Sequence, residues 1–157
     1  MATKCVCINL RRAASSVTRL YDEMLAPSGL LVTQFSLLLA IERAGEPRLG
    51  ELAEAMELDR TTLTRNLKPL ERQGLIEVSA GDDPRTRRVV VTRAGSAAIA
   101  RARPLWARAQ QVVRNALGGE ALDDMLRRLA ALLREVRSAP APSSKPATRA
   151  AHRDRSR

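Results

Sequence analysis

The chain has 157 residues, 45% of them apolar and only three aromatic, and its formal net charge at pH 7 is +10. This length suits one domain with a hydrophobic core, and the scarcity of aromatic rings favours a core of helices rich in Leu, Ala and Val. No apolar run approaches the roughly 20 residues that span a bilayer, and the N-terminus lacks the layout of a secretory signal, so we expect a cytoplasmic protein.

The positive charge is divided between the body of the chain and its end. Residues 138–157 hold five basic side chains against one acidic side chain, which leaves +6 of the total +10 on the body. Such a charge attracts polyanions, and nucleic acid is the commonest of these. A merely solvated basic surface is the alternative. We expect the Pro-, Ala- and Ser-rich tail to be disordered and to add non-specific attraction for DNA.

Two helices are predicted at the start of the chain. Residues 5–26 carry apolar side chains at helical spacing, and the turn residues Pro27, Ser28 and Gly29 follow them. Thr33 is a candidate N-cap for a second helix over 34–44. This helix is apolar nearly all round, which predicts a position in the centre of the fold.

Residues 49–75 predict a helix-turn-helix. A short helix over 49–56 precedes a two-residue link and a second helix over 59–75, with Asp59 as its N-cap and Gly74 as its stop. One face of the second helix is a buried stripe of leucines. The other face offers hydroxyls and cations to phosphates and base edges in a major groove: Arg60, Thr61, Thr62, Thr64, Arg65 and Lys68. An ordinary surface helix is the alternative, and Pro69 inside it should bend it.

Residues 75–92 change to the alternating period of strands. We predict strands over 75–78 and 88–92 with a polar turn between them. A hairpin directly after a helix-turn-helix makes a winged helix. Its basic tip is placed to enter a minor groove or clamp phosphates through Arg85, Arg87 and Arg88, with a solubilising loop as the alternative.

Two further helices are predicted, over about 95–117 with Pro104 inside, and over 120–137. Together with the first helix they supply more apolar surface than a small winged helix needs, which predicts a symmetric partner. The predicted fold class is therefore mainly α with a small β-hairpin: a winged helix-turn-helix with N- and C-terminal dimerisation helices.

This order of elements resembles the MarR family of bacterial transcriptional regulators. The resemblance is carried by LGELAEAMELDRTTLTRNLKPLERQGLIEV and DDPRTRRVVVTRAG, within roughly residues 5–137. It implies a single domain over 1–137, with dimerisation helices in 1–30 and 95–137 and a DNA-binding part in 33–92. It also implies a homodimer that places two winged helices on a pseudo-palindromic operator, associates with the bacterial nucleoid when bound to DNA, and usually represses transcription.

Regulators of this family commonly respond to a small ligand or to oxidation. Tyr21, Phe35 and Trp106, with Arg11 nearby, would suit a small aromatic carboxylate or phenol, and the alternative is that the rings are plain core. We predict that such an aromatic or phenolic ligand releases the operator.

Oxidation of Cys7 is the second candidate signal. Cys7, followed by Tyr21, looks like the start of the first helix in the branch of the family that senses organic hydroperoxides, where a cysteine at this position is oxidised. Two further tyrosines of that branch would fall at Val32 and Arg11 and are absent. Arg11 would favour a reactive thiolate. The alternative is that Cys5 and Cys7, too close for an unstrained disulfide, simply pack in the dimer interface.

Enzyme chemistry finds little support in the sequence. The one histidine, His152, lies in the tail, and no glycine-rich phosphate loop or metal-spaced cysteine cluster is present. We therefore predict no catalytic residues, no metal and no cofactor. A helical scaffold that does not bind DNA is the remaining alternative, although it would need no basic hairpin tip.

Overall fold

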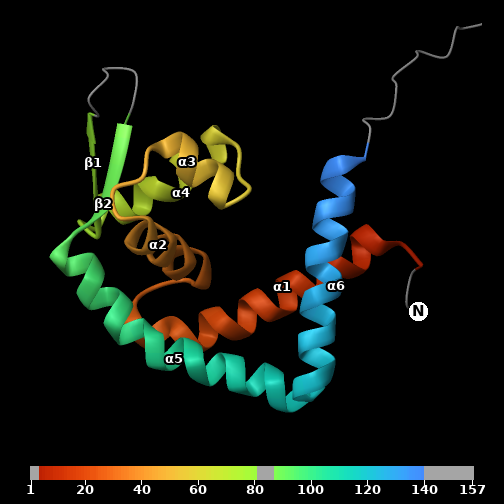
Figure 1. The fold of residues 1–157 in the computed structure, drawn as a ribbon. Helices are drawn as coiled ribbons and strands as arrows, with labels where there is room; N and C mark the ends of the chain where they lie inside the picture. Colours follow the sequence, from red (N-terminus) through yellow and green to blue (C-terminus); the bar gives the residue numbers. More distant parts are fainter. Residues whose placement is uncertain (1–3, 81–86, 140–157) are drawn as a thin grey trace, which may run out of the picture. The chain divides into compact units, whose positions relative to one another are not determined.

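The computed structural model describes residues 4–80 and 87–139. Its elements in chain order are helices α1 (Val6–Leu25), η1 (Ala26–Ser28), α2 (Val32–Ala44), α3 (Leu49–Ala55) and α4 (Arg60–Arg72), strands β1 (Ile76–Ala80) and β2 (Arg87–Val91), and helices α5 (Arg93–Leu117) and α6 (Gly119–Ser138) (Figure 1). This is the mainly helical winged helix-turn-helix that the sequence predicts. The chain divides into two compact units, Met1–Ala116 and Leu117–Arg157.

Helix α2 is the centre of the first unit, as its apolar sequence predicts. Phe35, Leu38 and Ile41 are at most 1% exposed, and the helix contacts α1, α3 and β2. Burying these side chains contributes about 1.5–3 kcal/mol each. This burial stabilises the platform on which the helix-turn-helix and the hairpin lie.

The start of α2 differs from the prediction that Thr33 caps it. The helix begins at Val32, so Thr33 lies inside its first turn. The Asp22 carboxylate on α1 accepts from the Val32 amide at 2.7 Å, and the Gln34 side chain accepts from the Leu31 amide at 3.0 Å. The acceptors at this helix start therefore come from a distant carboxylate and from the first turn itself, and the pattern of residues next to the helix does not reveal the first of them.

The turn between α3 and α4 contains a residue in the left-handed backbone conformation. Glu57 has φ +54°, and the next amide, of Leu58, donates back to the Ala53 carbonyl at 2.9 Å. This is the arrangement in which helices often end on glycine. Gly74, with φ +67°, ends α4 in the same way, as predicted, and the Leu75 amide donates to the Leu70 carbonyl at 2.9 Å.

The hairpin is antiparallel, with Ile76 opposite Val91 and Ala80 opposite Arg87. The loop before α3 adds to its outer edge, where Arg48 pairs with Arg88 and the Val89 amide donates to the Pro47 carbonyl at 3.2 Å. Strand β1 ends at Ala80, beyond the predicted end at residue 78. Strand β2 ends at Val91, so Thr92, which was predicted in the second strand, lies outside it. The predicted tip, including Arg85, falls outside the described residues.

Helix α5 packs its first half onto α2. Ala98, Ile99 and Ala102 belong to the core, and the Phe35 and Trp106 rings lie with centroids 6.1 Å apart at 44°. An ion pair of 3.5 Å joins Arg103 to Glu42, whose side chains are 58% and 38% exposed. The helix starts at Arg93, two residues before the predicted start, and Pro104 lies within it.

No single helix in the described part of the chain is long and apolar enough to cross a membrane. The bent pair Val6–Ser28 and Val32–Ala44, at 73°, passes such a test only on its joint length and composition. The second member of that pair is the core helix α2.

Candidate nucleic-acid interface

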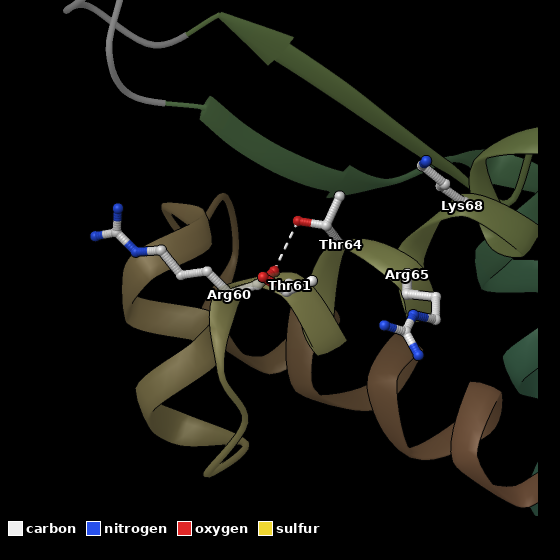
Figure 2. Close-up of a pocket in the computed structure, with 5 residues that line it drawn as sticks. All are labelled: Arg60, Thr61, Thr64, Arg65 and Lys68. Atoms are coloured by element: carbon white, nitrogen blue, oxygen red, sulfur yellow. Dashed lines mark hydrogen bonds between the residues drawn. The ribbon is translucent and has the colours of Figure 1, made fainter.

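The exposed face of α4 forms a shallow, polar and cationic groove. Its buried stripe, Leu63, Leu67 and Leu70, packs into the core and turns the opposite side outward. The groove encloses about 370 Å³, and five predicted DNA-contacting residues line it: Arg60, Thr61, Thr64, Arg65 and Lys68. All five side chains come from this one helix (Figure 2).

The first turn of α4 is held by Asp59, the predicted N-cap. Its carboxylate accepts from the Thr62 amide at 2.8 Å and from the Thr62 hydroxyl at 2.6 Å. The bond from the Thr62 hydroxyl, and next the bond from its amide, lower the pKa of Asp59 below the ordinary value of 3.8. Thr62 thus acts in the cap, although the sequence also suggested it for DNA.

Arg60 extends in a different direction from Arg65 and Lys68. Figure 2 shows its side chain reaching across α3, away from the other two cations. Its guanidinium lies over Gly50, where an added Cβ would be 3.2 Å from the Nη2 atom. The Arg60 carbonyl accepts from the Thr64 hydroxyl at 2.8 Å. The cations are therefore spread along the groove, and they present charge to more than one position on a polyanion.

The two described arginines of the wing have different surroundings. Arg87 is exposed at the start of β2, whereas Arg88 is half-buried and its Nη1 donates to the Glu46 carbonyl at 3.1 Å. Arg88 also lines a groove with Glu46 and Glu51 between α2, α3 and β2. The sequence grouped Arg88 with the DNA-contacting arginines, but the structure engages it with the loop before α3.

The predicted effector residues are brought together only in part. Phe35 and Trp106 are in contact, and Tyr21 is buried, which raises the pKa of its hydroxyl by desolvation. Arg11 is exposed and precedes Tyr21 by ten residues on α1, about 15 Å along the axis. Within one chain, Arg11 and Tyr21 therefore lie on separate parts of α1.

Both cysteines are exposed free thiols at the start of α1. Cys5 is the residue before the helix, and Cys7 lies in its first turn. The Cys5 carbonyl accepts from the Asn9 side chain at 3.1 Å. In the described chain no group of three His, Cys, Asp or Glu side chains is arranged to hold a metal ion.

Three contacts escaped the sequence analysis: Asp22 with the start of α2, Gly50 beneath Arg60, and Thr92 at the start of α5. The first two join residues ten positions apart, and Thr92 also bonds to Gly74, 18 positions before it. The third alone had a local signal, because a threonine three residues before the Gly95 amide fits an N-cap.

A helix-turn-helix, a hairpin wing and an exposed cationic second helix together define a winged-helix DNA-binding protein. Comparison with known proteins makes this class specific. The model of the MarR family matches residues 30–90. The Mycobacterium tuberculosis transcriptional regulator MosR, solved in complex with DNA, is 40% identical over 85% of this chain and 97% of its own, with a TM-score of 0.79. The chain belongs to the MarR family of transcriptional regulators.

Two more distant relatives are also transcriptional regulators. The transcriptional repressor CouR, solved on a 23-mer DNA duplex, is 28% identical over 83% of this chain and 93% of its own, with a TM-score of 0.76. An uncharacterised helix-turn-helix regulator of Bacillus subtilis, YwoH, is 29% identical over 84 residues, which are 54% of this chain and 61% of YwoH. The match thus spans less than two thirds of YwoH. Membership of a family of DNA-binding regulators agrees with the prediction that the chain is not an enzyme.

Proposed function

We propose that this regulator reads its operator with the exposed face of α4. The observation that supports this most is the groove in which Arg60, Thr61, Thr64, Arg65 and Lys68 share one helix face. Arg65 lies in the second turn, at mid-groove, from where a guanidinium can pair with guanine N7 and O6. Arg60 and Lys68 flank it and are better suited to phosphates, which fix the register without reading sequence.

The wing contributes a second contact in this proposal. The exposed Arg87, together with Arg85 of the adjoining segment, would neutralise phosphates or enter a minor groove. Arg88 would hold the wing against the Glu46 carbonyl, so that the neighbouring arginines meet the duplex at a set angle.

The regulator acts as a homodimer in this proposal. Large apolar side chains are exposed on α1, where Val6 is 61% exposed, and on α6, where Leu126 and Val136 are 53% and 64% exposed. A second copy of the chain would remove this surface from water. In this proposal α4 is the recognition helix, the helix that enters the major groove. Two recognition helices related by a dimer axis would then meet successive major grooves, about one helical turn apart, on a pseudo-palindromic operator.

Repression relieved by a small aromatic ligand is the regulatory mode we favour. CouR is a repressor that has been solved both with a DNA duplex and with p-coumaroyl-CoA, an aromatic thioester. In this chain the contact between Phe35 and Trp106 joins α2 to α5. An aromatic ligand inserted beside these rings would alter how the DNA-binding part sits on α5.

Thiol oxidation is the second candidate signal, because both cysteines are exposed at the start of α1. Exposure is a requirement for a redox sensor, and the thiolate is the reactive form. Oxidation of Cys7 would place a polar group on the helix that carries part of the proposed dimer surface.

A binding titration on the DNA that flanks its own gene tests these proposals. It is run with reduced protein, after treatment with an organic hydroperoxide, with p-coumaroyl-CoA as an aromatic probe, and with Cys7→Ser. Release by peroxide that disappears in Cys7→Ser would establish the thiol sensor. Tight binding that is released by the aromatic probe and is indifferent to oxidant would support the ligand mode. Absence of binding at any salt concentration would overturn the proposed operator.

A further inference from the structure

Thr92 joins the end of α4 to the start of α5. Its hydroxyl donates to the Gly74 carbonyl at 2.7 Å and accepts from the Gly95 amide at 3.1 Å. Its own amide donates to the Leu75 carbonyl at 3.0 Å. One residue therefore bonds both the turn that ends the recognition helix and the first turn of the long helix α5.

Gly95 brings the two backbones into direct contact at the same place. It is buried, and a Cβ added to it would overlap the Leu75 carbonyl oxygen and lie 2.7 Å from Cγ1 of Val91. A backbone carbonyl cannot rotate aside as the end of a flexible side chain can. The absence of a side chain therefore lets α5 start directly against the end of α4.

We propose that Thr92 is a positioning residue for operator recognition, which locks α4 to α5 so that the two helices turn as one piece. This rests on the proposed function, in which α5 leads to the dimer surface and α4 enters the groove. The 25 residues of α5 extend about 37 Å. A stiff joint at Thr92 would transmit a tilt of this helix to the recognition helix, whereas a loose joint would absorb it.

Two substitutions separate this role from that of an ordinary helix cap. Thr92→Asp keeps an acceptor for the Gly95 amide, and Asp is a good N-cap, but a carboxylate cannot donate to the Gly74 carbonyl and repels it. Thr92→Ser keeps both functions of the hydroxyl and serves as the matched control.

The joint is tested first without DNA, by amide hydrogen exchange on the full chain. In Thr92→Asp the Gly74 and Leu75 amides should exchange about five-fold faster, which is the change expected when one hydrogen bond is lost. The Gly95 amide should stay protected. Thr92→Ser should exchange like the wild type. Unchanged exchange at Gly74 and Leu75 in Thr92→Asp would reduce Thr92 to a helix cap and overturn the proposal.

The consequence for recognition is tested with a duplex that the wild-type protein selects from a randomised library, and with the same duplex carrying one extra base pair between its half-sites. The wild type should discriminate strongly between the two spacings. In Thr92→Asp this ratio should fall by about five-fold or more, and Thr92→Ser should restore it. The ratio cancels the uniform effect of an added negative charge on DNA affinity.

If Thr92→Asp kept the wild-type ratio between its affinities for the two spacings, the proposal would also be overturned. Failure of the wild-type protein to select any sequence would instead refute the proposed function, and the exchange experiment would still decide whether the joint exists.

Discussion

At the scale of single residues, the first turn of α4 depends on one carboxylate. Asp59 binds the amide and the hydroxyl of Thr62, and both bonds lower its pKa. Asp59 is exposed at the start of α4. Its effect on stability has a defined sign with pH, so the role of the carboxylate can be tested by changing the pH.

We expect Asp59→Ala to lower the thermal stability at neutral pH and Asp59→Asn, which still accepts from the Thr62 amide, to lower it less. The native pKa of Asp59 is below the ordinary value of 3.8, so its stabilisation is present above that value and is lost as the pH falls through the lower native one. Thermal unfolding followed from about pH 7 to about pH 2 should show the wild type converging on Asp59→Ala. A gap independent of pH would contradict the role of the carboxylate.

The cations of the groove make separable predictions. Arg65→Ala should weaken operator binding by about 1–3 kcal/mol and relax the sequence preference, if its side chain meets a base edge. Fluorescence titrations on the selected duplex and on a scrambled duplex measure both effects. Lys68→Ala is the comparison, because loss of a phosphate contact should weaken both duplexes alike and reduce the salt dependence. Equal losses on both duplexes in Arg65→Ala would place it on phosphate instead.

At the scale of elements, the turn of the helix-turn-helix carries a local strain. Glu57 adopts the left-handed conformation at φ +54°, which costs a residue with a side chain more than it costs glycine. The bond from Leu58 to Ala53 holds it there. This turn sets the angle between α3 and α4, and the strain is therefore the cost of orienting the recognition helix.

Glu57→Gly should raise the free energy of unfolding by roughly 0.5–1 kcal/mol, because it removes this steric cost. Glu54→Gly, at an exposed position inside α3, should lower it by a similar amount. Chemical denaturation of both variants gives the comparison. A destabilised Glu57→Gly would show that other contacts of Glu57 outweigh the strain.

The two arginines at the start of β2 should behave differently. Arg88→Ala loses the bond to the Glu46 carbonyl and should destabilise the fold by about 1 kcal/mol. Arg87→Ala should change stability by less than about 0.5 kcal/mol, yet weaken binding to all DNA sequences and reduce the salt slope by about one. Parallel unfolding and DNA titrations separate the two. Equal behaviour of the variants would remove the distinction between anchor and contact.

At the scale of the whole molecule, large apolar side chains of α1 and α6 are exposed in the single chain, as expected of the homodimer we propose. Leu126 and Leu133 on α6 are 53% and 52% exposed, and Val6 on α1 is 61% exposed. Surface of this kind in each chain would be removed from water by a second copy, and the resulting dimer would set the distance between the two recognition helices.

Leu126→Arg should shift the protein from a dimer to a single chain of 17.2 kDa, because a charge would be buried in the interface without a partner. Light scattering after size-exclusion chromatography measures the mass. Glu54→Arg, which adds the same side chain to the exposed face of α3, should remain dimeric. A dimeric Leu126→Arg would place the interface elsewhere.

Much of this protein could be predicted from its sequence because the signals are local. Helical spacing, the Asp59 cap and the Gly74 stop identified α4 and the outward face of Arg60, Thr61 and Arg65. Hydrophobic period and capping act within one or two turns, so the chain itself displays them.

Only the tertiary structure decided which side chains bond to residues that are distant in the chain. The bond from the Val32 amide to Asp22, the bond from Arg88 to the Glu46 carbonyl, and the bond from Thr92 to the Gly74 carbonyl each link residues at least ten positions apart. Such contacts depend on how the elements pack, and no residue spacing along the chain records them. The sequence by itself determined which face of α4 is exposed, the face we propose for DNA, and packing determined how that face is held.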